Sequence, residues 1–456
     1  MNIAIIMLPE RGGYYATFLL ARALVRRGHR VVYYGTADFA EDVRRQGFEY
    51  VTMFQDEYGP GTLDLPPVPD GFFARLRFTK QLFRRMRPHR FLEATVSGEV
   101  ERLLRSHAVD IILVDPLLRW LGAPLARAGF RVMSLSTELI GDGFSLPPTS
   151  SGFVPREGSV TSSIWCRVIW VAHLAQHYSK LLFRRVLSAV YSGDAPPLRL
   201  TYQLWKRSSG SGYPRFLSEY GIRHRFPEIV LCPRAFDFPS RAPVRRRYAG
   251  LTVEVDRQEV DFPWERLDRL RGAIVYVSLG THAALYVGKT SRFLRTVLDV
   301  ARQRTDLRFV LVLGVGRSVN DIGDVPENVV AVQFVPQIAL LKRASVAVTN
   351  GGLGTIKECV LLRVPMIVVP CMYDQPGNAA RVAFHGIGRR ADIRKISARA
   401  LGGLIDECRQ SEAIKQALRR MSTAFASTTE TEAALDFVLG HPGPEPGPAA
   451  PLPLAS

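Results

Sequence analysis

The sequence predicts an α/β protein built from two doubly wound domains. Short apolar runs end at glycine or polar turns, helical patterns lie between them, and the alternation recurs in the second half. Continuous apolar runs of this kind are typical of parallel strands that are covered on both faces. Strands that alternate with helices form doubly wound sheets. The length of 456 residues suits two or three domains, each with its own core.

The first half predicts a Rossmann-like domain over residues 1–235. Its elements, in order, are a strand at residues 2–8, a glycine-containing turn at 9–13, a helix at 17–27, a strand at 31–34, a strand at 110–114, a helix at 118–128 and a strand at 131–135. The first of these form one strand–helix–strand unit within about 35 residues, which fixes parallel pairing.

The second half, residues 271–438, repeats the pattern and predicts a second Rossmann-like domain. Strands are expected at residues 273–278, 308–313, 329–333, 346–349 and 365–370, with helices at 293–304, 355–362 and 379–384. An amphipathic stretch at 411–438 predicts a last helix that packs back on the N-terminal domain. Residues 236–270 are proline-containing and weakly periodic, which predicts a linker, and the Pro/Gly/Ala-rich residues 439–456 predict a disordered tail.

The charge balance narrows the range of partners. Lys and Arg number 60 against 42 Asp and Glu, which gives a formal net charge of +18. Such an excess favours nucleic acid, a membrane surface or phosphorylated substrates. No nucleic-acid motif accompanies the charge, so we expect no nucleic-acid partner. The basic stretches at residues 75–90 and 164–191 predict either solvated helix faces or a surface for anionic lipid.

The cysteines and the N-terminus bear on the compartment. Five cysteines without a CxxC pair support neither a disulfide framework nor a structural zinc site. The N-terminus lacks the features of a signal peptide, and no apolar stretch reaches the 18 residues of a membrane span. We therefore expect a cytoplasmic protein with no metal. The basic stretches additionally suggest peripheral contact with the inner membrane surface.

The most informative chemistry lies where the strand at residues 346–349 runs into the glycine-rich residues 350–355. Glycines there let backbone N–H groups approach an anion at the positive N-terminus of the next helix. Glu358 lies one turn further on, where it can accept hydrogen bonds from vicinal hydroxyls. Asp374 and Gln375 follow another strand and can bind sugar hydroxyls. In open α/β sheets ligands bind at the carboxyl ends of strands, where all these residues are expected.

This ordered set resembles the nucleotide-sugar signature of the family 1 glycosyltransferases, which include bacterial macrolide transferases and plant and animal UDP-glycosyltransferases. The matching motifs are Phe334-Val335-Pro336-Gln337, residues 350–358, Arg363-Val364-Pro365 and residues 374–382. The resemblance implies the GT-B fold, in which two Rossmann-like domains face each other across a cleft. It also implies inverting transfer of a hexose from a UDP- or dTDP-sugar to a small lipophilic acceptor, a natural product or a lipid, with no cofactor.

The same resemblance assigns roles to residues. The donor set comprises Ser278, Gly280, Thr281, Phe334, Val335, Gln337, Asn350, Gly351, Gly352, Gly354, Thr355, Glu358, Asp374 and Gln375. Phe334 is expected to stack on the base, Glu358 to bind ribose and Thr355 to hold phosphate. Three plainer interpretations stand beside these: Phe334 in the core, Glu358 as a solvated helix carboxylate, and Thr355 as a helix cap. Tyr14 and Tyr15 are expected to line the acceptor pocket.

Two positions depart from the family pattern. At the position of the family's phosphate-binding histidine this chain has Asn350, which can donate a hydrogen bond but carries no charge. At the position of the family's general-base histidine this chain has Gly13. The aspartate that orients this histidine in the family corresponds to Asp115. A positioned imidazole contributes roughly 10²–10⁴-fold to such a transfer, so its absence matters.

Four interpretations of the missing base remain open. Asp115 acts as the base itself, directly or through a water, or His282 supplies an imidazole from the other domain. Alternatively, the acceptor is a phenol or carboxylic acid that needs little help. In the fourth, the chain is an impaired transferase homologue that serves as a partner or scaffold.

Overall fold

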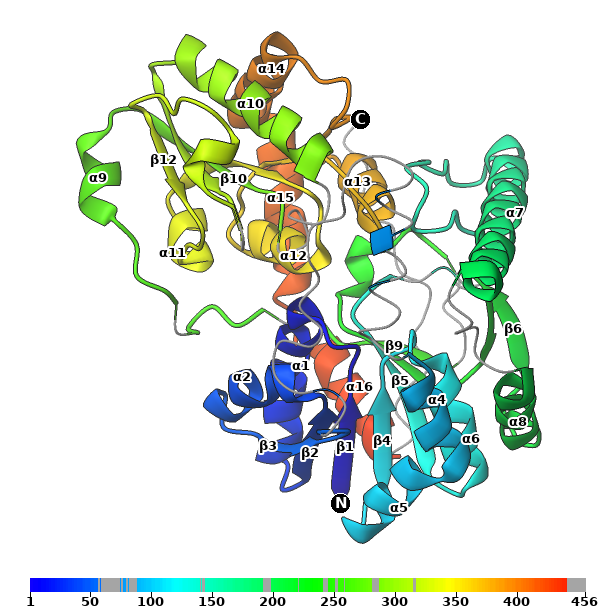
Figure 1. The fold of residues 1–456 in the computed structure, drawn as a ribbon. Coiled ribbons are helices and arrows are strands. Elements are labelled where there is room, and N and C mark those ends of the chain that lie inside the picture. Colours follow the sequence, from blue (N-terminus) through cyan, green and yellow to red (C-terminus); the bar gives the residue numbers. More distant parts are fainter. Residues whose placement is uncertain are drawn as a thin grey trace.

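The computed structural model describes residues 1–440 apart from several short gaps. The gaps are residues 56–57, 59–73, 75–76, 79–80, 82–87, 140, 142–143, 192–197, 220, 241–244, 251–252, 258, 281–286 and 315–316. Two α/β domains follow each other along the chain (Figure 1). The predicted fold class of two doubly wound domains is confirmed.

The N-terminal sheet has, among the described residues, seven strands in the order β3-β2-β1-β4-β5-β8-β9, all paired in parallel. The strands are β1 (Asn2–Ile6), β2 (Arg30–Gly35), β3 (Glu49–Thr52), β4 (Ile111–Val114), β5 (Arg131–Ser136), β8 (Glu228–Val230) and β9 (Arg246–Tyr248). The order reverses between β1 and β4, and the crevice at such a switch point is where α/β sheets bind ligands. Strand β9 lies within the range expected to be a linker and extends the sheet instead.

The C-terminal sheet has six described strands in the order β12-β11-β10-β13-β14-β15, again all parallel. The strands are β10 (Ala273–Ser278), β11 (Leu307–Val312), β12 (Val329–Val332), β13 (Ala344–Thr349), β14 (Met366–Val368) and β15 (Gly388–Arg390). Its switch point lies between β10 and β13. Both sheets are therefore built alike, and each offers one crevice at the carboxyl ends of its strands.

Helices cover both sheets, and a two-stranded hairpin of β6 (Arg215–Ser218) and β7 (Gly221–His224) stands apart. In the first half the helices are α1 (Arg11–Arg26), η1 (Ala37–Phe39), α2 (Ala40–Arg45), α4 (Pro88–Ser97), α5 (Glu99–Ser106), α6 (Arg119–Arg127), α7 (Val160–Tyr191), α8 (Leu198–Ser208) and η2 (Arg234–Phe236). In the second half they are α9 (Trp264–Arg269), α10 (Val287–Gln303), η4 (Val319–Asp321), α11 (Gln337–Leu341), α12 (Leu353–Leu361), α13 (Gln375–Phe384), α14 (Ala398–Gln410), α15 (Glu412–Phe425) and α16 (Thr429–Leu439).

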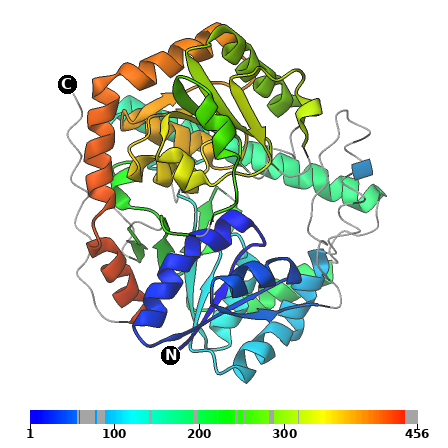
Figure 2. The same ribbon diagram turned by 90° about the vertical axis from the view of Figure 1, so that its left-hand side faces the viewer.

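The last helix, α16, returns to the N-terminal domain. Figure 2 shows it beside α1, below the long helix α15. Its apolar side chains Ala434, Leu435 and Val438 are buried in the N-terminal core. On the surface Arg27 of α1 forms ion pairs with Glu432 and Asp436 of the same helix.

Buried polar contacts join the two halves. Lys357 Nζ of α12 donates to the carbonyl of Leu231, just after β8, at 2.8 Å. Arg381 of α13 donates to Asp237 Oδ1 from Nε at 2.9 Å and from Nη2 at 2.7 Å, and both side chains are buried. Asp237 lies between β8 and β9, so this pair ties α13 to the edge of the N-terminal sheet.

Candidate functional site

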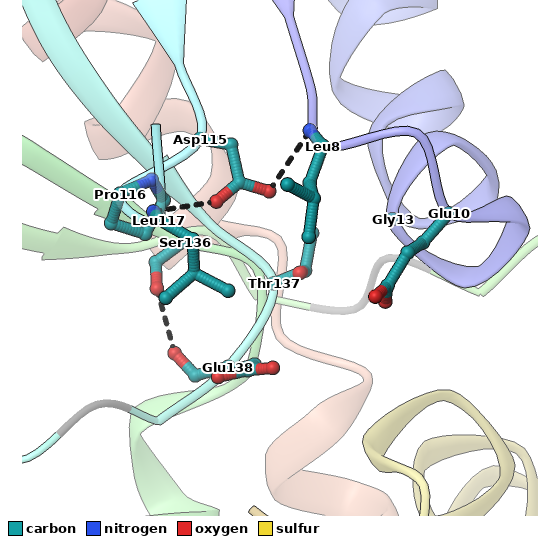
Figure 3. A pocket seen from close by; sticks show the side chains of 9 residues that line it. All are labelled: Leu8, Glu10, Gly13, Asp115, Pro116, Leu117, Ser136, Thr137 and Glu138. Carbon is teal, nitrogen blue, oxygen red and sulfur yellow. Dashed lines mark hydrogen bonds between the residues drawn. The ribbon is translucent and has the colours of Figure 1, made fainter. Parts of the chain in front are cut away.

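The first half of the site forms at the N-terminal switch point. Asp115 directly follows β4, and Ile6 of β1 is in register with Val114 of β4, so the turns after both strands meet. Asp115 Oδ1 accepts a hydrogen bond from the N–H of Leu117 at 2.8 Å and Oδ2 accepts one from Leu8 at 3.3 Å (Figure 3). These two bonds fix the orientation of the carboxylate between the turns.

Asp115 is only 5% exposed, and this burial raises the pKa of its carboxyl to about 6. The two backbone hydrogen bonds lower the pKa in part, and the nearby Glu10 carboxylate raises it further. A carboxylate with a pKa near neutrality binds a proton more readily than an ordinary aspartate, which suits a general base.

A small recess with a cavity volume of about 20 Å³ opens beside Asp115. Its described lining residues are Leu8, Glu10, Gly13, Asp115, Pro116, Leu117, Ser136, Thr137 and Glu138 (Figure 3). The structure thus brings Gly13 and Asp115 to one recess, and none of these lining residues is a histidine. A Cβ built on Gly13 would have Met7 Cε at 3.8 Å as its nearest neighbour, so a Cβ atom fits there without a clash.

Two lining carboxylates, Glu10 and Glu138, were not singled out in the sequence. Glu10 stands one turn before Gly13 at the start of α1, and Glu138 follows β5 by two residues. The position of Glu10 beside the glycine turn was the available signal. No sequence pattern marked Glu138 as a site residue, because it reaches the recess only through the pairing of β5 with β4 in the sheet.

The expectation that Tyr14 lines the acceptor pocket is wrong. Its side chain is completely buried, its ring stacks on Phe39 with centroids 4.9 Å apart, and its hydroxyl lies 3.5 Å from that of Tyr50. Successive residues of a helix are rotated by about 100°, so the position after Gly13 turns into the core. Tyr15 is partly exposed, and its role in acceptor binding stays a prediction.

The second half of the site forms at the C-terminal switch point. Ser278 of β10 is in register with Thr349 of β13, so the turns that follow these strands lie side by side. Asn350 spans them: its Oδ1 accepts from the N–H of Gly352 at 3.3 Å, and its Nδ2 lies against Gly280. Gly280 has a φ of +75°, and a Cβ there would stand 2.8 Å from that nitrogen, so this turn favours glycine.

Helix α12 starts at this point with open N–H groups. Gly352 is its N-cap residue, and no side chain caps the helix. Thr355 accepts a hydrogen bond from Gln337 Nε2 at 3.2 Å and does not cap, so the interpretation of Thr355 as a helix cap is wrong. Uncapped N–H groups and the helix dipole together favour an anion at this end.

Glu358 lies within the same helix and is buried, which rules out a solvated carboxylate. Arg257 Nη1 donates to its Oε1 at 2.7 Å, and Gln337 Nε2 donates to its Oε2. Gln337 is itself held by the hydroxyl of Tyr276 at 2.8 Å. Nearby, Glu259 accepts from the first N–H groups of α11. Arg257 and Glu259 were missed because nothing local marks a residue whose partner is far along the chain.

Phe334 lies in the loop between β12 and α11 and is 44% exposed, which excludes a place in the core. The exposed ring is free to stack on a flat ligand. Val335, the next residue, packs against the C-terminal core. Thr281 and His282 lie outside the described residues.

The loop predicted to hold the donor sugar is ordered by its own side chains. Gln375 Oε1 accepts from the N–H groups of Cys371 and Met372 at 2.8 and 3.0 Å. Asp374 is buried and accepts from Asn378 Nδ2 at 2.8 Å. Burial raises the pKa of Asp374 to about 6.

A segment of the N-terminal domain reaches this loop. Gly377 N donates to the carbonyl of Thr149 at 2.6 Å, and a Cβ on Gly377 would collide with that backbone. Thr149 is held in turn by the buried carboxylate of Glu219, which accepts from its N–H at 2.8 Å and from its hydroxyl at 2.7 Å. Glu219 was missed in the sequence, and it positions the contact between the domains.

Two features are absent from the described residues. No group of three or more His, Cys, Asp or Glu side chains there is arranged to hold a metal ion. No described helix combines the length and apolar character needed to cross a bilayer.

Comparison with known proteins gives consistent relatives. Residues 296–437 match the family described as erythromycin biosynthesis protein CIII-like, C-terminal domain. Oleandomycin glycosyltransferase of Streptomyces antibioticus is 32% identical over 447 residues, which cover 96% of this chain and 90% of that protein. NDP-glycosyltransferase YjiC of Bacillus licheniformis is 22% identical over 96% of each chain. With two uncharacterized UDP-glucosyltransferases of Bacillus subtilis, the match spans about half of the relatives' length.

Solved structures agree on the fold. The glycosyltransferase of kitacinnamycin superposes with a TM-score of 0.63 at 22% identity, covering 96% of this chain and 97% of that one. Glycosyltransferase VinC, solved in complex with dTDP, gives a TM-score of 0.60 at 19% identity, with coverage of 96% and 99%. The extended similarity to oleandomycin glycosyltransferase and the shared architecture show that this chain belongs to the family 1 glycosyltransferases with the GT-B fold, related to the macrolide and natural-product transferases.

Proposed function

We propose that this enzyme transfers a hexose from a UDP- or dTDP-sugar to a small lipophilic acceptor, with inversion and with Asp115 as the general base. The proposal rests on the presence of a candidate site at the switch point of each sheet. One is the uncapped N-terminus of α12 with Glu358, and the other is the Asp115 recess. Relatives named for transfer to macrolides and a solved relative that holds dTDP support the same class of substrates.

On the donor side, the first turn of α12 receives the diphosphate. Its open N–H groups stabilise the negative charge that grows on the leaving diphosphate. Glu358 accepts from the ribose hydroxyls, and the exposed ring of Phe334 stacks on the base. Asn350 carries no charge but orders the turn before α12, because its side-chain carbonyl oxygen accepts a hydrogen bond from the N–H of Gly352.

On the acceptor side, Asp115 takes the proton of the attacking hydroxyl. The acceptor oxygen bonds to the anomeric carbon as the bond from that carbon to the diphosphate oxygen breaks, and the nucleoside diphosphate leaves with the electron pair. The proton passes to the Asp115 carboxylate and then to solvent. A buried carboxyl with a pKa of about 6 is ionised at neutral pH and still basic enough to accept this proton.

A calorimetric titration with UDP and dTDP tests the donor site. We expect saturable binding of at least one nucleotide, weakened tenfold or more in Glu358→Ala. Glu407→Ala is the matched control, since that glutamate also pairs with an arginine, Arg389, but is an exposed side chain of α14. Binding of neither nucleotide would contradict the proposal.

Transfer is then followed with labelled donor and a panel of lipophilic alcohols and phenols. The configuration at the new anomeric centre, read by NMR, tests inversion. No histidine stands among the described residues that line the Asp115 recess, and this favours one second candidate, a homologue that acts as a scaffold. Nucleotide binding with no transfer to any acceptor, and transfer that appears only in Gly13→His, would support that candidate instead.

A further inference from the structure

We propose that the outward face of helix α7 docks this protein on the surface of an anionic phospholipid bilayer. The proposal concerns a surface outside both switch-point sites and does not depend on the transfer reaction. Figure 1 shows α7 as a long helix at the outer edge of the molecule, and Figure 2 shows it extending beyond the C-terminal domain.

One side of α7 is anchored to the protein. Cys166 and Trp170 are buried, and Trp170 Nε1 donates to the carbonyl of Leu146 at 2.6 Å. His173 Nε2 lies 2.7 Å from the carbonyl oxygen of Glu219, and its Nδ1 lies 2.9 Å from Ser150 Oγ. These residues recur every three or four positions, so they define the inward face and leave the opposite face to solvent.

The opposite face is mainly apolar, with Thr161 and Ser179 as exposed polar positions, whereas a solvated helix face is mainly polar. Seven large side chains point outward, each at least half exposed: Val160, Ile164, Trp165, Val168, Val171, Leu182 and Phe183. The small residues Ala172 and Ala175 lie between them on the same side. At 1.5 Å per residue the face runs for about 36 Å. An apolar face of this length is rarely left to water and marks an interaction site.

The charged residues of α7 indicate which kind of binding partner fits this face. The sequence of α7 contains no Asp or Glu. Arg167 and Lys180 are exposed beside the apolar stripe, and the chain as a whole carries a net charge of +18. An aromatic and aliphatic face whose charged neighbours on the same helix are cations complements a surface with an apolar interior and negatively charged headgroups. That is the interfacial layer of an anionic bilayer, in which such helices lie parallel to the membrane plane.

The anchored side gives this docking a structural consequence. The residues that hold α7 include Leu146, Ser150 and Glu219, and Glu219 also holds Thr149 against the donor-sugar loop. A membrane bound to α7 would therefore be connected to the contact between the two domains through His173, Glu219 and Thr149.

Co-sedimentation of the full-length protein with vesicles tests the proposal. The probes are vesicles of phosphatidylcholine alone and of phosphatidylcholine with 30% phosphatidylglycerol. We expect binding to the anionic vesicles, at least tenfold weaker binding to the neutral ones, and loss of binding in 0.5 M salt. The variant Trp165→Ser/Leu182→Ser/Phe183→Ser should reduce binding to anionic vesicles by about tenfold or more.

Controls separate docking from misfolding and from other occupants. Val25→Ser/Val260→Ser removes apolar side chains of similar exposure elsewhere and should leave vesicle binding unchanged. An unchanged UDP affinity and melting temperature of the α7 variant would show that its fold is intact. Equal binding of the α7 variant and the wild type, or no preference for anionic vesicles, would overturn the proposal. Sedimentation velocity that shows a wild-type dimer and a monomeric α7 variant, without vesicle binding, would assign the face to a second copy of this chain.

Discussion

Arg257 Nη1 lies 2.7 Å from Glu358 Oε1, so the carboxylate expected to bind the donor ribose is held by a residue from the segment between the two domains. Gln337 completes its surroundings from α11. The position of Glu358 is therefore set by three separate parts of the chain. The proposed contact of Glu358 with the ribose therefore depends, through this pair, on the path of the interdomain segment.

The first prediction follows from this ion pair. Arg257→Met should weaken UDP binding about tenfold, because Glu358 loses the cation that orients it, and a hydrogen bond to a charged group contributes about 1.5–3 kcal/mol. Calorimetric titration measures the change. The control is Arg389→Met, which breaks a more exposed pair with Glu407 and should leave the affinity unchanged. Tighter binding in Arg257→Met would mean that the arginine competes with the ribose instead of preparing its site.

The second prediction concerns the recess. Gly13→His should fold normally, because the nearest atoms to a Cβ there are 3.8 Å and 4.0 Å away. We expect kcat for alcohol acceptors to rise by about 10–100-fold, since Asp115 would then orient an imidazole base. Gly12→His is the matched control: its Cβ also has open space, but this position does not line the recess. An equal rise in both variants would show that the effect has nothing to do with Asp115.

The third prediction concerns Asp115 and pH. Burial raises its pKa to about 6, and only the ionised form accepts a proton. The rate of transfer should therefore rise between pH 5 and pH 7, with a midpoint of about 6, and then level off. Asp115→Asn should lower kcat by about 10²–10⁴-fold and abolish this rise, while UDP affinity stays the same. A variant that keeps both its rate and the midpoint would exclude Asp115 as the base.

The fourth prediction concerns the stability of the interdomain joint. Burial alone would raise the pKa of Asp237, but Arg381 and a hydrogen bond from Tyr248 hold it below its ordinary value. Asp237→Asn leaves the Arg381 cation buried without a carboxylate, which should cost about 3–5 kcal/mol at pH 7. Thermal unfolding measures the loss. Asp306→Asn, in an exposed pair with Arg304, should cost less than about 1 kcal/mol.

The pH dependence of that joint has a definite sign. A lowered pKa means that the ionised pair stabilises the fold above about pH 4, the pKa of an unfolded aspartate, and that this contribution is lost as pH falls through the folded-state value. The difference in melting temperature between Asp237→Asn and the wild type should therefore shrink below about pH 4. A difference that stays constant down to pH 3 would show that charge is not what the pair contributes.

The sequence by itself determined the elements and the order of the motifs. Apolar runs and glycine turns identified the strands that lead to Asp115 and Asn350, because strand burial and backbone freedom are local properties. The family pattern then located Gly13 and Glu358. With two parallel doubly wound sheets, the carboxyl ends of neighbouring strands had to bring Gly13 to Asp115.

The tertiary structure alone decided which distant side chains meet. Arg257 pairs with Glu358, which is 101 residues away in the chain, and Asp237 pairs with Arg381, which is 144 residues away. The rotation of α1 sends Tyr14 into the core, and the edge of the N-terminal sheet takes up β9 from the expected linker. Periodicity along a chain encodes the face of each element. The partner of that face depends on strand order and on helix orientation, which are set only when the whole domain packs.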